Sequence, residues 1–108
     1  MTGRDQDERS IPFSEIDPLI HAPARLRLMT QLYVVEAADA TFLVNETGLT
    51  WGNLATHLRK LEDHGYLTID KEFRNRKPRT VVSLTPPGRA AFRRYRAAIQ
   101  DALAALPD

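Results

Sequence analysis

The apolar residues of this 108-residue chain change their spacing twice, and the order of the changes limits the folds open to it. From Asp17 to Gly65 they recur every three or four residues, as in helices. From Leu67 to Leu84 they alternate with polar residues, as in strands, and from Pro86 the helical spacing returns. The order predicts helix, short helix, helix, two-stranded hairpin and long helix. A mainly α fold with a β-hairpin wing, the winged helix-turn-helix, has this order.

Capping residues and prolines predict where the first helices begin. Asp17 can cap a first helix with Pro18 in its first turn, and Pro23 is expected to start a second helix after a break. The second helix should fade within residues 36–39. Thr41 is then the candidate cap of the short helix.

Two glycines bound the helix that follows the short helix, called the third helix because it is third in the predicted order. Gly48 is expected to end the short helix in the left-handed conformation, Thr50 to cap the third helix, and Gly65 to end it. Thr85, followed by Pro86, marks the start of the last helix in the same way. The buried stripe of the third helix is expected to consist of Leu54, Leu58 and Leu61.

The face of the third helix opposite this stripe carries amide, hydroxyl and cationic groups. Such groups suit a recognition helix, because they hydrogen-bond base edges and neutralise phosphates, and Gly52 would allow close approach to DNA. An ordinary solvated helix face is the alternative. The candidate DNA-binding residues are Thr50, Trp51, Gly52, Asn53, Thr56, Arg59 and Lys60. For Trp51, partial burial against the short helix is favoured over stacking on bases.

The hairpin tip, expected at about residues 74–78 after a strand with Leu67, Ile69 and Phe73, is strongly basic. The segment 73–79, FRNRKPR, has four positive charges and no acid. A wing of this kind contacts the phosphate backbone or inserts an arginine into the minor groove, although a solubilising loop is the alternative. The candidate wing residues are Arg74, Asn75, Arg76, Lys77 and Arg79.

The net charge of +1 conceals an uneven distribution of charge. Residues 1–20 hold two basic and five acidic residues, whereas residues 50–80 hold seven basic and four acidic ones. The cations therefore gather where the recognition helix and the wing are expected, and this distribution favours a nucleic-acid partner.

Several classes of function are excluded or disfavoured. The chain has no cysteine, which excludes a disulfide framework, a thiolate zinc site and a cysteine nucleophile. His57, His64 and Asp63 supply too few converging ligands for a metal ion, so no metal site is expected. His57 is expected to be a partly buried packing residue. No phosphate-binding loop, carboxylate pair or catalytic triad is visible, so we expect neither an enzyme nor a cofactor. Short apolar runs and the lack of a signal-peptide pattern predict a cytoplasmic protein.

The two ends of the chain suggest its organisation. Residues 1–13 are expected to form a disordered tail or a dimer arm, and residues 14–106 one winged-helix domain. The last helix has a coiled-coil-like apolar seam which, with the apolar residues of 11–20, exceeds the needs of a small core. We therefore expect a homodimer. The candidate interface residues are Phe92, Tyr95, Ile99, Leu103 and Leu106.

Three segments carry a family resemblance: DPLIHAPARLRLMTQL, TGLTWGNLATHLRKLEDHGYLTI and RKPRTVVSLTPPGRAAF. Together they resemble winged-helix transcriptional regulators of the MarR/ArsR superfamily, especially the short single-domain group. The resemblance covers most of residues 16–100 and implies a homodimeric regulator, generally a repressor, on an inverted-repeat operator in double-stranded DNA.

In this family the third helix enters the major groove and the wing touches the backbone or the minor groove. The resemblance places Thr50, Gly52, Asn53, Thr56 and Lys60 in the major groove, and Arg76, Lys77 and Arg79 on the wing. It gives Arg25 a packing role or a phosphate contact. A small-molecule effector is possible in the family, and its identity is open. The alternative function is a protein-binding winged-helix adaptor, which would more often carry apolar groups on this face.

Overall fold

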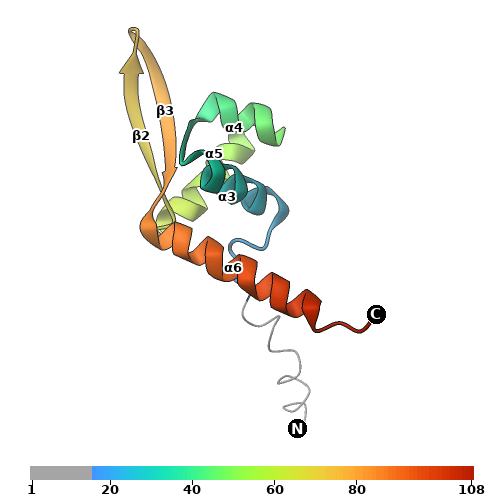
Figure 1. Cartoon of the computed structure of the whole chain (residues 1–108). Coiled ribbons are helices and arrows are strands. Elements are labelled where there is room, and N and C mark those ends of the chain that lie inside the picture. Colours follow the sequence, from blue (N-terminus) through green and yellow to red (C-terminus); the bar gives the residue numbers. More distant parts are fainter. Residues whose placement is uncertain (1–15) are drawn as a thin grey trace.

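The computed structural model describes residues 16–108, and its elements follow the predicted order with one additional strand (Figure 1). The predicted tail, residues 1–13, lies outside the described residues. The elements are α3 (Pro23–Val35), β1 (Ala37–Asp39), α4 (Ala40–Thr47), α5 (Trp51–Asp63), β2 (Leu67–Arg74), β3 (Lys77–Leu84) and α6 (Pro86–Ala104).

The strands form one antiparallel sheet in the order β1-β3-β2. The long hairpin β2–β3 projects from the helices, and α6 runs away from its base (Figure 1). Strand β1, which the sequence did not predict, pairs Ala38 with Val82 of β3. It follows directly from α3, because Glu36 adopts a φ of 70° and turns the chain out of the helix. Three residues are too few to show an alternating pattern.

Two of the predicted helix starts were wrong. Asp39, not Thr41, caps α4, and its carboxylate accepts a hydrogen bond from the backbone N–H of Phe42 at 2.8 Å. Strand β1 holds Asp39 in the extended conformation that a cap needs. Residues 17–20 form a turn instead of a helix, in which Asp17 accepts a hydrogen bond from the N–H of Leu19 at 2.9 Å.

The caps around α5 are confirmed. Gly48 ends α4 with a φ of 73°, and the hydroxyl of Thr50 accepts a hydrogen bond from the N–H of Asn53 at 3.1 Å. At the other end Gly65 has a φ of 84°, and the N–H of Tyr66 bonds to the carbonyl of Leu61 at 3.0 Å. The leucine stripe of α5 is buried in one core with the apolar face of α3; its members are Leu28, Met29, Leu32, Leu54, Leu58 and Leu61.

Helix α6 is joined closely to the start of β2. Thr85 caps α6 through the N–H of Gly88, and its own N–H donates to the carbonyl of Tyr66 at 3.0 Å. Gly88 packs directly on the backbone of Tyr66. The base of the hairpin and the long helix are thereby held together.

Asp39→Ala is expected to lower the free energy of unfolding by about 1–2 kcal/mol, because the cap of α4 and an ion pair with Arg79 are both lost. Asp39→Asn should cost less, since an asparagine still caps. The hydrogen bond from Phe42, and next the charge of Arg79, hold the pKa of Asp39 below its ordinary 3.8. The ionised carboxylate of Asp39 therefore stabilises the fold fully above pH 3.8, and this stabilisation is lost as the pH falls through the lowered pKa. Urea unfolding of the wild type and of Asp39→Ala at neutral and at acidic pH measures this stabilisation. A difference in the free energy of unfolding that is equal at the two pH values would contradict it.

Candidate nucleic-acid interface

The predicted recognition residues lie together on the solvent-exposed side of α5. The helix is anchored from behind, since Leu54, Leu58 and Leu61 are at most 4% exposed. The exposed residues at its N-terminal end and along its outer face are Thr50, Trp51, Gly52, Asn53, Thr56, Arg59 and Lys60.

The hydrogen-bonding groups on this face are partly committed to the helix itself. The hydroxyl of Thr50 caps α5, and that of Thr56 donates to the carbonyl of Gly52 at 3.0 Å, which leaves its lone pairs as acceptors. A Cβ added at Gly52 would meet nothing within 4 Å, so the surface here is open. The amide of Asn53 offers both a donor and an acceptor. The face can therefore read base edges or bind phosphates.

Arg25, which the resemblance left between packing and phosphate binding, packs behind α5. Its Nε donates to the carbonyl of Leu19 at 2.5 Å, and its Nη1 lies 3.3 Å from Nδ1 of His57. Burial, then the charges of Arg25 and Lys60, lower the pKa of His57, which favours the neutral ring that can accept from Arg25. His57 is half-buried, as predicted.

The wing, here the hairpin of β2 and β3, has a shorter turn than predicted. Only Asn75 and Arg76 lie between the strands, with φ of 53° and 67°. Two central residues with positive φ define a type I′ turn, in which asparagine and glycine are preferred. An arginine at the second position is therefore unusual. The exposed residues at the tip are Arg74, Asn75, Arg76 and Lys77.

Arg79 lies on β3, just behind the tip, where it pairs with Glu72 of β2. Its guanidinium forms an ion pair with the carboxylate of Asp39 at 2.5 Å, and both side chains are 27% exposed. The ion pair links β3 to the cap of α4, because Asp39 is both that cap and the last residue of the neighbouring strand β1. Arg79 thus fixes the wing to the helical body, and part of its charge is neutralised.

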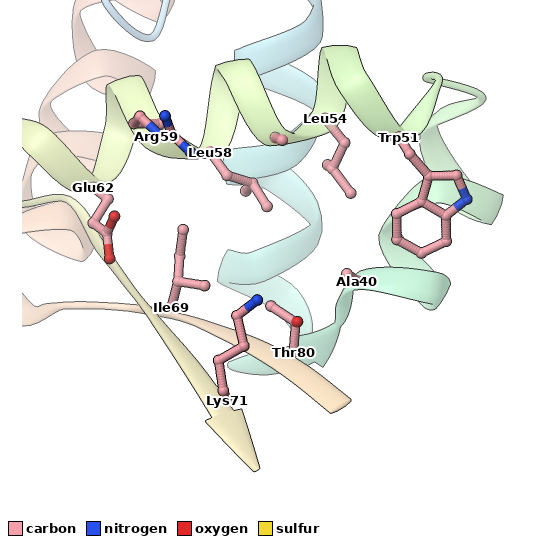
Figure 2. Close-up of a pocket in the computed structure, with 10 residues that line it drawn as sticks. Ala40, Trp51, Leu54, Leu58, Arg59, Glu62, Ile69, Lys71 and Thr80 are labelled. Carbon is pink, nitrogen blue, oxygen red and sulfur yellow. The ribbon is translucent and has the colours of Figure 1, made fainter. Parts of the chain in front are cut away.

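A groove of about 460 Å³ separates α5 from the wing (Figure 2). Its apolar lining comes from Leu54 and Leu58 of α5 and Ile69 of β2, and Trp51 stands at one end. Trp51 lines the groove with Ala40 of α4, yet it is 56% exposed, so the expected burial against the short helix is slight. The polar residues along the groove are Arg59, Glu62, Lys71 and Thr80.

Lys71 and Thr80 line the groove as well, although they were not among the candidate residues predicted from the sequence. They are a cross-strand pair two residues outward from Ile69 and Val82, and so they lie on the same face of the hairpin. The alternation from Ile69 to Lys71 was the available signal.

The predicted interface seam of α6 divides into two parts. Phe92 and Tyr95 are buried in the core of the same chain, where Phe92 packs on Tyr33 with ring centroids 5.0 Å apart. The hydroxyl of Tyr95 lies 2.8 Å from Nδ1 of His21. Ile99 is half-buried against the core, whereas Leu103 and Leu106 are 59% and 57% exposed. Only the C-terminal part of the seam is thus available to a partner.

None of the helices within residues 16–108 combines the length and the apolar character needed to cross a bilayer. The same part of the chain contains no group of three or more His, Asp or Glu side chains arranged to hold a metal ion.

Comparison with known proteins identifies the family. A winged helix DNA-binding domain profile matches residues 24–103. An uncharacterized protein of Methanocaldococcus jannaschii is 31% identical over 77 residues, which cover 71% of this chain and 84% of that protein.

Solved structures agree with this assignment. A transcriptional regulator homologue from Pyrococcus horikoshii OT3 superposes with a TM-score of 0.76 at 30% identity, over 80% of this chain and 85% of that one. A MarR-family regulator from Enterococcus faecalis V583 gives a TM-score of 0.69 at 24% identity, over 96% and 90%, which shows the shared fold. The chain therefore belongs to the family of winged helix DNA-binding domains, with the fold of MarR-family and archaeal transcriptional regulators.

Proposed function

We propose that this protein is a homodimeric, sequence-specific transcriptional regulator that places α5 in the major groove of DNA and the wing on the adjacent backbone and minor groove. The observation that carries the proposal is that α5 and the wing lie on the two sides of one groove, to which α5 contributes Arg59 and the wing contributes Lys71 and Thr80. A surface of this shape and charge complements the alternating grooves of a duplex.

The two elements have different tasks in this proposal. Asn53 and Thr56, near the N-terminus of α5, contact base edges, and Lys60 contacts a phosphate. Arg74, Arg76 and Lys77 supply charge at the wing tip, where the turn holds them away from the body of the protein. Arg79 positions the wing through its ion pair with Asp39.

The homodimer is supported by exposed apolar residues at the C-terminal end of α6 and just after it. Leu103 and Leu106 are large apolar side chains that a partner helix would cover. A two-fold dimer places its two recognition helices about 34 Å apart, one turn of DNA, and so requires an inverted repeat. Occupying such an operator near a promoter would repress transcription, and this proposal needs no effector.

Selection of binding sites from a pool of random duplexes tests the proposal with the intact protein. We expect enrichment of an inverted repeat, and light scattering at micromolar concentration should give the mass of a dimer. A protein that enriches no sequence would favour the adaptor alternative, and a monomer on an unrepeated site would contradict the dimeric arrangement.

Arg76→Gly is expected to raise the free energy of unfolding by up to about 1 kcal/mol, because glycine adopts the left-handed turn position without strain. The same change should weaken DNA binding and reduce the salt slope by about 0.9 for each phosphate contact removed. Thermal unfolding and binding titrations at several salt concentrations measure both effects. If Arg76→Gly bound DNA as tightly as the wild type at every salt concentration, Arg76 would have no role at the wing tip.

A further inference from the structure

The two sides of the wing differ in character. Side chains of paired residues alternate between the faces of a hairpin, so the pairs Leu67–Leu84 and Ile69–Val82, each with one buried and one partly buried member, identify the inner face. Two more pairs continue this face outward, Lys71 with Thr80 and then Phe73 with Pro78. The inner face therefore ends near the tip in an apolar pair.

This inner face is directed toward α5. Ile69, Lys71 and Thr80 line the groove in front of α5, and Figure 2 shows Lys71 and Thr80 on the strands opposite the helix. Pro78 and Trp51 line a neighbouring hollow, so the face continues outward on the same side. Phe73 is the cross-strand partner of Pro78 and lies next in line.

Phe73 is the most exposed large apolar side chain of the described residues, at 77%. Counting from the closing pair Arg74–Lys77 of the two-residue turn, Phe73 and Pro78 form a non-hydrogen-bonded pair, whose side chains approach closely. Pro78 loses nothing there, since its missing N–H would point away from β2. The hairpin thus supports the phenyl ring with a rigid proline, although the ring has little contact with the body of the protein.

The charges around the ring indicate what covers it. On the opposite face, Arg74 and Lys77 flank it toward the tip, and the pair of Glu72 with Arg79 flanks it toward the body. On its own face Lys71 follows it toward the groove, which also holds Arg59. Glu62 is the single acid among the residues lining the groove. A second wing would bring two acid-free tips together, and their like charges would repel each other. A partner with an anionic surface and an apolar interior fits the cations and the exposed ring better. DNA is such a partner, because its phosphates are anionic and its stacked bases are apolar.

We propose that Phe73, supported by Pro78, is a wedge that enters the minor groove, partly unstacks one base step and bends the duplex. The inference rests on the proposed function and adds a residue that reads the deformability of DNA. In this arrangement one DNA strand separates the major groove, which holds α5, from the minor groove, which holds the wedge. The backbone of that DNA strand lies in the protein groove between α5 and the wing, with its phosphates near Lys71, Thr80 and Arg59. The wedge then meets the base step just beyond that strand.

Such a wedge has a sequence preference without hydrogen bonds to bases. Pyrimidine–purine steps such as TA and CA unstack most easily, so they should be enriched where the wing contacts the site. The cations beside the ring attract phosphates of any sequence and carry no such preference. Removing the ring and removing a cation therefore have different consequences.

The test compares Phe73→Ser, Phe73→Leu and Arg76→Ala on duplexes selected with the wild type. We expect Phe73→Ser to bind about tenfold more weakly, as after the loss of one base-pair contact, with an unchanged salt slope. Energy transfer between dyes at the duplex ends should show the bend lost with serine and mostly kept with leucine. Arg76→Ala should lower the salt slope and keep the bend.

Three outcomes would overturn the wedge. These are a wild-type complex with straight DNA, a Phe73→Ser complex that is equally bent and equally tight, and selected sites without flexible steps under the wing. A Phe73→Ser protein whose DNA-free mass falls in light scattering would assign the ring to a protein contact instead. A wild type that binds no duplex refutes the proposed function itself, and is distinguished by the lack of any selected sequence.

Discussion

Replacing Gly88 with alanine is expected to lower the free energy of unfolding by roughly 3 kcal/mol. A Cβ at this position would lie 1.9 Å from the carbonyl oxygen of Tyr66 and 2.7 Å from its carbonyl carbon. These are backbone atoms, so no flexible side chain can move aside. Helix α6 would have to shift, and the hydrogen bond from the N–H of Thr85 to the same carbonyl would be lost.

Thermal unfolding at one fixed protein concentration measures the effect, and a fall in Tm of more than about 10 °C is expected for a domain of this size. Gly52→Ala is the matched control. It also lies in the first turn of a helix, but its Cβ would meet nothing within 4 Å, so alanine should be neutral or stabilising by up to about 1 kcal/mol. Equal stability of the two variants would show that α6 does not pack on Tyr66 as described.

Replacing Arg74, Arg76 and Lys77 together with alanine is expected to weaken DNA binding by at least about tenfold at moderate salt. The three cations lie at an exposed tip, so their loss should leave the fold intact. If each contacts one phosphate, the slope of log affinity against log salt should fall by about 0.9 per contact, or nearly 3 per subunit. Arg79 is left in place because its ion pair with Asp39 supports the wing.

Fluorescence titrations over a range of salt concentrations, on selected and shuffled duplexes, measure this loss. The triple variant should lose affinity for both duplexes to a similar extent. Asn53→Ala is the contrasting variant, since it should reduce the preference for the selected sequence and keep the salt slope. A triple variant that lost only the preference would mean that the wing reads bases and not the backbone.

Much of the fold could be predicted because its signals are local. Helix α5 is bounded by Gly48, Thr50 and Gly65, whose capping roles depend on neighbouring backbone atoms alone. The leucine stripe fixed which side of α5 faces the core, and therefore which side faces solvent. The candidate residues on α5 and at the wing tip follow from these rules, whereas their contacts with DNA stay predictions.

The predictions that were wrong concern features that depend on contacts between residues distant in sequence. Strand β1 exists because Ala38 pairs with Val82, and Asp39 caps α4 while binding Arg79, forty residues later. The seam of α6 was periodic throughout, but periodicity does not distinguish a core of the same chain, which takes Phe92 and Tyr95, from a partner's surface.

The exposure of the Phe73 ring could not be predicted either, because it depends on the absence of a contact distant in sequence. Phe73 was predicted to lie in one strand with Leu67 and Ile69, and its pairing with Pro78 does continue their face of the hairpin. The strands, however, extend beyond the helices, so no core is present to cover the ring (Figure 1). How far a hairpin projects from its domain depends on the whole packed structure.

The affinity of the intact protein for its selected duplex, compared with a shuffled duplex at about 0.15 M salt, tests the central claim most directly. The proposed regulator should bind the selected duplex at least about a thousandfold more tightly, the lower end for specific DNA-binding proteins. Equal affinity for the two duplexes, or no binding to either, would contradict the account.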